Sequence, residues 1–139
     1  MVVLLPSDQL QYIIAHARNT YPEECCGFLI GTVFGPRIVR RVLPAWNTAQ
    51  PSKLKRYSID PTELVRADEE ANRSNLKLFG VYHSHNDAPV EPSVIDFEFA
   101  WPDFTYLVLS LQSGEPRDVG AWSLNHTRTA FESDELRLF

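Results

Sequence analysis

The stretch from Val81 to Asp96 carries the residues of this chain that are best suited to metal chemistry. It reads VYHSHNDAPVEPSVID, so one residue separates His83 from His85 at the end of an apolar run. Residues two apart on a strand project to the same face, about 7 Å apart along the backbone. Both imidazoles can therefore converge on one ion, and a carboxylate from a nearby helix start would be a third ligand.

Two histidines and one carboxylate, with a fourth position left for water, form the ligand set of a catalytic zinc site. The ligand set alone also allows iron or manganese. A lone histidine at a strand end would more often be structural, but an alternating pair followed by Ser93 and Asp96 at a predicted helix start favours a metal site. Ser84 lies between the histidines and should face the other side of the strand, so we predict no catalytic role for it.

A catalytic site of this kind also needs a group that accepts a proton from water. No residue within the stretch is free for that task, so the sequence requires a carboxylate from elsewhere in the chain. The stretch containing His83 and His85 resembles the full signature of the JAMM (MPN+) metallopeptidases, with Ser93 and Asp96 at the matching spacing. The upstream segment PEECCG, residues 22–27, resembles the Pro-x-Glu-x-Cys-Gly element of the same family.

The resemblance implies a role for each matching residue. It implies one zinc ion with three protein ligands: His83, His85 and Asp96. It implies that Glu24 acts as general base and then as general acid, and that Ser93 stabilises the oxyanion of the attacked carbonyl. Glu23 is the rival for the base, but the spacing to Gly27 favours Glu24, and adjacent residues on a strand face opposite ways.

The resemblance covers most of the chain, from about Ser7 to about Leu124, and is closest to short bacterial members that act on ubiquitin-like sulfur-carrier proteins. It implies hydrolysis of a peptide or isopeptide bond after the carrier's C-terminal Gly-Gly, for example with release of cysteine in a cysteine-biosynthesis route. A glycine tail can add to a sheet edge and pass through a narrow channel. Residues 86–91 and 47–57 are the predicted walls of that channel.

Two other classes of function are compatible with parts of this pattern. A catalytically inactive MPN-type scaffold or interaction domain would keep the fold without the metal, but every motif residue is present here. A cysteine nucleophile, Cys25 or Cys26 with a histidine, would explain the thiols instead. Both cysteines lie in an apolar run, where burial raises the pKa of a thiol and makes it inert, so we expect structural cysteines.

Composition and charge limit the partners of the protein. The 139 residues are expected to form a single JAMM domain, residues 1–139, and the formal net charge of −5 argues against nucleic acid. The basic cluster of Lys53, Lys55 and Arg56 is expected to be a solvated loop rather than a phosphate-binding patch. Adjacent cysteines are too close for an ordinary disulfide, so free thiols are expected. With no membrane span or signal peptide recognised at MVVLLP, we expect a cytoplasmic protein without a membrane partner.

Periodicity predicts the elements that must position these residues. A helix is expected from Ser7, with Ser7 as its cap and Leu10, Ile13, Ile14 and Ala17 as its apolar stripe. A second helix is expected from Asp60 to about residue 72, with Asp60 as its cap and Pro61 at the first helical position. A third is expected from Ser93 to about residue 100, where Ser93 and Asp96 resemble a capping box with aspartate in place of glutamate. Four residues of the second helix are expected to face the core: Leu64, Val65, Ala67 and Ala71. His16 lies off the apolar stripe of the first helix and is not counted as a ligand.

Strands are predicted for residues 23–35, 37–43, 57–59, 76–85, 105–112 and 119–124, with a turn at 113–118. The first residues are expected to be an edge strand or a tail, and residues 126–139 to add an edge strand. This order indicates the α/β (α+β) class. The resemblance implies a mixed, largely antiparallel sheet flanked by helices, the cytidine-deaminase-like JAMM fold.

Overall fold

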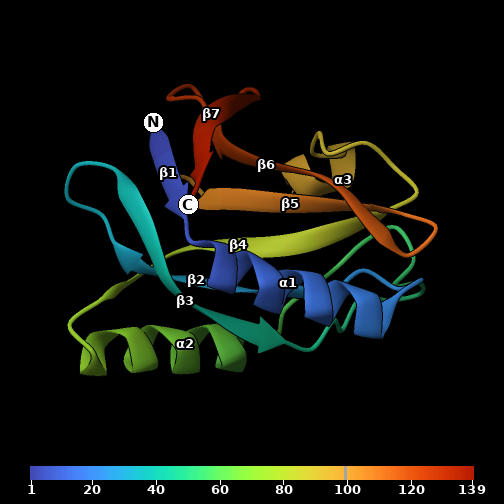
Figure 1. Cartoon of the computed structure of the whole chain (residues 1–139), viewed down its shortest axis with the longest axis horizontal. Coiled ribbons are helices and arrows are strands. Elements are labelled where there is room, and N and C mark those ends of the chain that lie inside the picture. Colours follow the sequence, from blue (N-terminus) through green and yellow to red (C-terminus); the bar gives the residue numbers. More distant parts are fainter. Residues whose placement is uncertain (99) are drawn as a thin grey trace.

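The computed structural model describes residues 1–98 and 100–139 of the chain (Figure 1). In chain order its elements are β1 (Val2–Leu5), α1 (Ser7–Thr20), β2 (Cys26–Thr32), β3 (Arg37–Ala45), α2 (Pro61–Arg73), β4 (Lys77–Asn86), α3 (Val94–Glu98), β5 (Thr105–Gln112), β6 (Glu115–Leu124) and β7 (Phe131–Leu138). The strands form one closed sheet in the order β1-β3-β2-β4-β5-β6-β7. Its pairing is mixed, so the predicted mixed α/β architecture is confirmed at this level.

The closure of the sheet corrects the prediction for both ends of the chain. β1 pairs in parallel with β3 on one side and with β7 on the other, so it is neither an edge strand nor a tail. β7 likewise pairs with both β6 and β1. Val3 and Leu5 of β1 are fully buried, and closure removes the unpaired N–H and C=O groups that an edge would expose. The sheet is therefore a closed barrel and not simply the sheet flanked by helices that the resemblance implied, although α1 and α2 pack against part of it.

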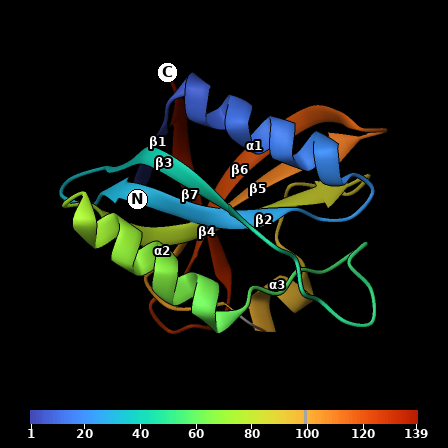
Figure 2. The ribbon, with the colours of Figure 1, turned by 90° about the horizontal axis from the view of Figure 1, so that it is seen from below.

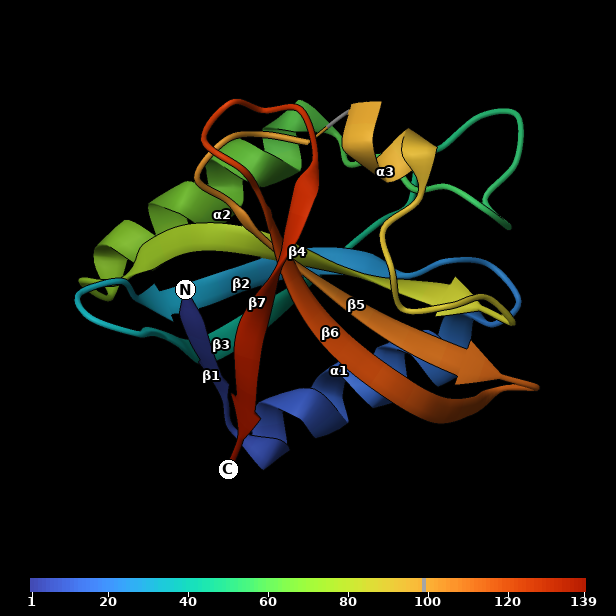
Figure 3. The same ribbon diagram turned by 90° about the horizontal axis from the view of Figure 1, so that it is seen from above.

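Helices α1 and α2 lie on opposite sides of strands β2 and β4 (Figures 2 and 3). α1 contacts β3, β4 and β5, and it buries Ile13, Ile14 and Ala17 as the apolar stripe predicted. Its N-cap position is Pro6, and Ser7 is the first helical residue, so the predicted Ser7 cap is wrong. Across residues 1–98 and 100–139, no helix is both long enough and apolar enough to cross a membrane.

Helix α2 begins as predicted. The Asp60 side chain accepts a hydrogen bond from the Thr62 backbone N–H at 2.8 Å. This contact is the expected N-cap interaction. Ala67 and Ala71 are buried, but Val65 is 56% exposed, so its predicted inward position is wrong. Val65 precedes Ala67 by two residues and therefore lies about 200° around the helix from it.

Four predicted segments differ from the observed ones. The strand predicted at residues 23–35 is β2, which spans only Cys26–Thr32, so Glu23 and Glu24 lie outside it. Residues 57–59 are not a strand but part of a loop, residues 46–60, that lies beside α3 (Figures 2 and 3). The predicted turn at 113–118 shrinks to Ser113 and Gly114, whose φ angles of 51° and 81° match a tight two-residue hairpin turn. β6 therefore begins already at Glu115. α3 ends at Glu98, and the part of the predicted helix at Phe99 lies outside the described residues.

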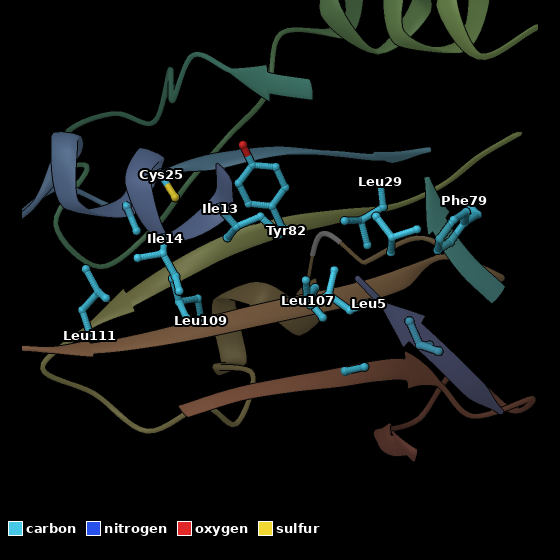
Figure 4. Close-up of a cluster of buried hydrophobic side chains, with 14 residues drawn as sticks. Leu5, Ile13, Ile14, Cys25, Leu29, Phe79, Tyr82, Leu107, Leu109 and Leu111 are labelled. Atoms are coloured by element: carbon cyan, nitrogen blue, oxygen red, sulfur yellow. The ribbon is translucent and has the colours of Figure 1, made fainter. Parts of the chain in front are cut away.

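Two apolar clusters lie on opposite faces of strands β2 and β4. The first cluster joins α1 to β1, β2, β4 and β5 and contains Cys25 and Tyr82 (Figure 4). The second cluster lies beside α2 and contains Cys26 and Val81. Since side chains alternate along a strand, His83 should lie on the same face as Val81, opposite Tyr82. The side that carries α2 is therefore the side on which the histidines are presented.

A glycine in β4 sets how closely the histidine-bearing strand approaches β5. Gly80 pairs with Thr105, and a Cβ at Gly80 would lie 2.2 Å from the Thr105 carbonyl oxygen. We predict that Gly80→Ala lowers the free energy of unfolding by about 2 kcal/mol or more, because the backbone of β4 or β5 must shift to make room for the methyl group. Urea denaturation measures this.

The matched control for this prediction is Gly35→Ala. A Cβ at Gly35 meets nothing within 4 Å, so only its φ of +73° opposes the substitution. The control should cost about 1 kcal/mol. An equal loss in both variants would contradict the proposed tight approach of β4 and β5.

Candidate metal centre

The ligand atoms predicted from the sequence converge in the structure. The Nε2 atoms of His83 and His85 lie 3.1 Å apart, and Asp96 Oδ2 lies 3.2 Å from the first and 3.0 Å from the second. All three residues are buried. β4 supplies both histidines and α3 supplies the carboxylate. One small space is therefore faced by two ring nitrogens and one carboxylate oxygen.

The spacing of these atoms fits a metal ion. In a tetrahedral zinc site with bonds of about 2.0–2.1 Å, neighbouring ligand atoms lie about 3.3 Å apart. The three observed separations are 3.0, 3.1 and 3.2 Å. Two imidazoles and a carboxylate, without a thiolate, are also ligands that suit zinc. Within the described residues, this trio is the group of histidine, cysteine and acidic side chains that could hold an ion.

The two histidines are oriented in different ways. Nδ1 of His85 lies 2.7 Å from the Pro89 carbonyl oxygen, so it donates its proton there and leaves Nε2 free to bind a metal. Nδ1 of His83 is buried and, within the described part of the chain, has no hydrogen-bond partner. Burial lowers the pKa of His83, which favours the neutral imidazole that a metal requires. The Nδ1 side of the His83 ring is therefore held by packing rather than by a hydrogen bond.

The carboxylate is fixed by the start of α3. Ser93 N–H donates to Asp96 Oδ2 at 2.8 Å, and Asp96 N–H donates to Ser93 Oγ at 3.1 Å. This reciprocal pair is the predicted capping box with aspartate in place of glutamate. Burial alone would raise the pKa of Asp96, but the neighbouring histidines and the Ser93 N–H reverse this effect and hold the pKa well below its usual range. Asp96 is therefore an anion aimed at the histidines.

Glu24 is buried next to this trio, whereas Glu23 is exposed. Only 4% of Glu24 is accessible, and its Oε1 is buried without a hydrogen-bond partner among the described residues. Desolvation raises the pKa of Glu24 to about 8, and the charges of His85 and Asp96 act on it in opposite directions. The structure thus directs Glu24 inward and Glu23 outward, as predicted, but strand alternation is not the reason, because β2 begins only at Cys26. A buried carboxyl of this kind can take up and release a proton near neutral pH.

Both cysteines are free and buried, as predicted. Burial raises the pKa of Cys25 to about 11 and raises that of Cys26 further. Thiols of this kind are rarely ionised near neutral pH and are poor nucleophiles. Cys25 also lies in the cluster on the other face of β2, away from the histidines.

A cavity of about 360 Å³ opens beside Asp96. Residues 48–50 and 56–57 of the predicted segment 47–57 line it, together with Ile95 and Trp101. Residues 87–91 line a different cavity, of about 400 Å³, together with β5 and β6. The sequence placed Asn47 and Tyr57 at the ends of a predicted channel wall, but it gave no sign that they contact Glu24 and His83 respectively.

Comparison with known proteins agrees with this geometry. The family model of prokaryotic homologs of the JAB domain matches residues 6–125. The desampylase of Haloferax volcanii is 34% identical over 111 residues, which cover 76% of this chain and 78% of the relative. A probable TtuB-protein conjugate cleaving protease of Thermus thermophilus is 35% identical over 100 residues, which cover 72% of this chain and 64% of the relative. The CysO-cysteine peptidase of Mycobacterium tuberculosis is 26% identical over 124 residues, which cover 88% of this chain and 83% of the relative.

Solved structures agree as well. A solution structure of a protein from Desulfitobacterium hafniense has a TM-score of 0.86 and 30% identity, covering 99% of this chain and 92% of that one. A JAB1/MPN domain protein from Archaeoglobus fulgidus has a TM-score of 0.59 at 16% identity, covers 96% of both chains, and shows the same fold. The predicted resemblance to JAMM peptidases is confirmed by these matches. The chain belongs to the family of prokaryotic homologs of the JAB domain.

Proposed function

We propose that the protein is a zinc-dependent peptidase that hydrolyses the peptide or isopeptide bond after the C-terminal Gly-Gly of a small ubiquitin-like sulfur-carrier protein. The observation that carries this proposal is the convergence of His83, His85 and Asp96 in one buried group. Residues 1–139 would act as one catalytic domain. Two buried free thiols support a cytoplasmic location.

The metal would be held by three protein ligands: His83 Nε2, His85 Nε2 and Asp96 Oδ2. When bound, zinc supplies a Lewis acid that polarises the scissile carbonyl and makes water easier to deprotonate. Pro89 and Ser93 support this arrangement, because each forms a hydrogen bond with one of the ligands. Hydrogen-bond partners of this kind orient the ligand side chains before a metal ion binds.

Glu24 is proposed as the residue that moves the proton. Its buried carboxylate would accept a proton from the attacking water and then deliver it to the leaving amine. Oε1 has no protein partner in the described residues, so it is free for this task. A pKa of about 8, caused chiefly by desolvation, makes both the uptake and the release of a proton accessible near neutral pH.

Ser93 is proposed to stabilise the oxyanion. Its Oγ accepts a hydrogen bond from the Asp96 backbone N–H, which leaves the hydroxyl proton free to donate to the developing charge. The same bond holds the hydroxyl within the turn that presents Asp96. A donor fixed in this way costs little reorganisation when the charge forms.

The substrate class is supported by the names of the relatives. One relative is named for cleaving conjugates of a protein with TtuB, and another for acting on CysO-cysteine. We propose the shared chemistry for this chain, namely attack on a bond that follows the flexible tail of a small carrier protein. The cavity beside Asp96 would receive part of that tail.

Two substitutions separate metal binding from proton transfer. His83→Ala should lose the zinc, because it removes one of three ligands, and should lose turnover with it. Glu24→Gln should keep zinc but lower turnover by about 100-fold or more, because it removes the proton acceptor. Metal analysis of the purified variants, together with a cleavage assay, checks both outcomes. Equal zinc loss in the two variants would reassign Glu24 as a ligand.

Mass spectrometry of the cleavage products tests the proposed substrate class. We expect the protein to cleave a ubiquitin-like carrier, fused through its Gly-Gly tail to cysteine or to a second protein, directly after the second glycine. A chelator should abolish the cleavage, added Zn²⁺ should restore it, and thiol alkylation should leave it unchanged. A fusion with Val-Val in place of Gly-Gly is the control. Loss of activity by alkylation alone would instead support a cysteine nucleophile.

The raised pKa of Glu24 predicts a pH effect on the metal-free protein. Desolvation raises its folded-state pKa from 4.5 to about 8, so the folded state holds an extra proton between these values. The stability of the folded state should therefore fall as pH rises through that window. Glu24→Gln should raise the free energy of unfolding by about 3–5 kcal/mol at pH 8 and by much less at pH 4.

Urea denaturation of chelator-treated protein at both pH values measures this effect. Glu23→Gln is the matched control, because Glu23 is an exposed neighbour with the same chemistry. Its effect should be near zero at both pH values. A Glu24→Gln effect that is the same at pH 4 and pH 8 would contradict the raised pKa.

A further inference from the structure

Glu24 lies outside the sheet that positions the rest of the site. β2 begins two residues later, at Cys26, so the ladder of the barrel does not hold the Glu24 backbone. The Glu24 N–H donates instead to the Lys53 carbonyl oxygen at 2.8 Å. The Glu24 carbonyl oxygen accepts from Asn47 Nδ2 at 3.0 Å. Both backbone polar groups of Glu24 are thus bonded to residues 47–57, which we call the site loop.

Asn47 also determines the shape of the site loop. Its Nδ2 donates a second hydrogen bond, to the Arg56 carbonyl oxygen at 3.0 Å. Its Oδ1 accepts from the backbone N–H groups of Ala49 at 3.0 Å and Ser58 at 3.2 Å. One amide side chain therefore ties the two ends of the loop together and ties both to Glu24. This number of bonds from one side chain uses nearly its whole hydrogen-bonding capacity.

The other end of the site loop contacts His83, the proposed ligand whose Nδ1 lacks a hydrogen bond among the described residues. The Tyr57 ring stacks on His83 with 4.5 Å between centroids and 25° between planes. His83 Nδ1 has no partner among the described residues, whereas His85 Nδ1 bonds to Pro89. Metal-binding histidines are ordinarily oriented through this second nitrogen. At His83 the Tyr57 stack restrains the face of the ring, whereas the His85 ring meets it edge-on with 4.9 Å between centroids.

We propose that the site loop is a positioning element with two separate contacts: Asn47 fixes the backbone of Glu24, and Tyr57 fixes the imidazole of His83. Asn47 and Tyr57 are positioning residues, because each acts through another group. The inference rests on the proposed function, in which Glu24 transfers protons and His83 binds zinc. Changes at Tyr57 should therefore affect zinc affinity, and changes at Asn47 should affect turnover.

The Tyr57 contact is tested by zinc affinity, without any substrate. Metal-free protein is titrated with Zn²⁺ in competition with a chelating indicator. Tyr57→Leu should weaken zinc binding by about 10-fold or more, because His83 loses the restraint on its ring. Tyr57→Phe should stay within about 2-fold of the original protein, because the stack uses the ring face and not the hydroxyl. Tyr12→Leu, an exposed tyrosine on α1, is the control and should change nothing.

The Asn47 contact is tested by turnover at saturating zinc. Asn47→Asp and Asn47→Ala both remove the donor to Glu24, and each should lower kcat by about 10- to 100-fold with a smaller change in KM. Zinc affinity should stay within about 3-fold, because Asn47 does not touch a ligand. Asn125→Ala is the control, since Asn125 holds a surface turn by the same kind of bond to the backbone N–H of Thr129. Asn47→Asp keeps the loop acceptor and serves if Asn47→Ala fails to fold.

The outcomes separate this inference from the proposed function. If the unaltered protein neither binds zinc nor cleaves a carrier fusion, the proposed function fails. If it does both, and Tyr57→Leu and Asn47→Asp behave like their controls, the positioning role of the loop is wrong. If both variants lose zinc affinity and kcat equally, together with thermal stability, the loop is general support and the two-contact proposal is overturned.

Discussion

The structure depends on bringing three polar groups together where water is nearly excluded. His83 is fully buried, and His85 and Asp96 are only 5% and 6% accessible. Burying a carboxylate and two imidazoles is costly unless they are paired or bind a cation. Their ligand atoms lie 3.0–3.2 Å apart, which is the spacing that a shared ion requires. The remaining architecture can be understood as the scaffold that holds these atoms at this separation.

Strand β4 and the short helix α3 hold the three converging residues, whereas a loop holds Glu24. β4 is paired with β2 on one side and β5 on the other, so the spacing of the histidines is set by two strand ladders. The capping box then ties Asp96 to the short helix α3. Glu24 has no such ladder and is held by a loop. Glu24 and the three converging residues are therefore held mainly by different parts of the fold, and the stack of Tyr57 on His83 is the contact that links them.

Local signals in the sequence predicted local structure well. Asp60 and Pro61 indicated where α2 starts, and Ser93 with Asp96 indicated a capping box, because these interactions span only a few residues. The Ser7 cap was a local signal that failed, but most errors arose where long-range contacts decide. β1, which was predicted to be an edge strand or a tail, lies within the closed sheet because β3 and β7 both pair with it. Val65 points outward although its type is apolar, because α2 has only a narrow buried face.

The sequence by itself determined the ligand chemistry, the spacing of the two histidines on one strand and the family, since these follow from residue type and separation. Tertiary structure alone decided that the sheet closes and that Asn47 and Tyr57 contact Glu24 and His83. It also decided that Glu24 is buried enough to raise its pKa. The physical reason is that desolvation and hydrogen bonding depend on atoms distant in sequence, which no local pattern encodes.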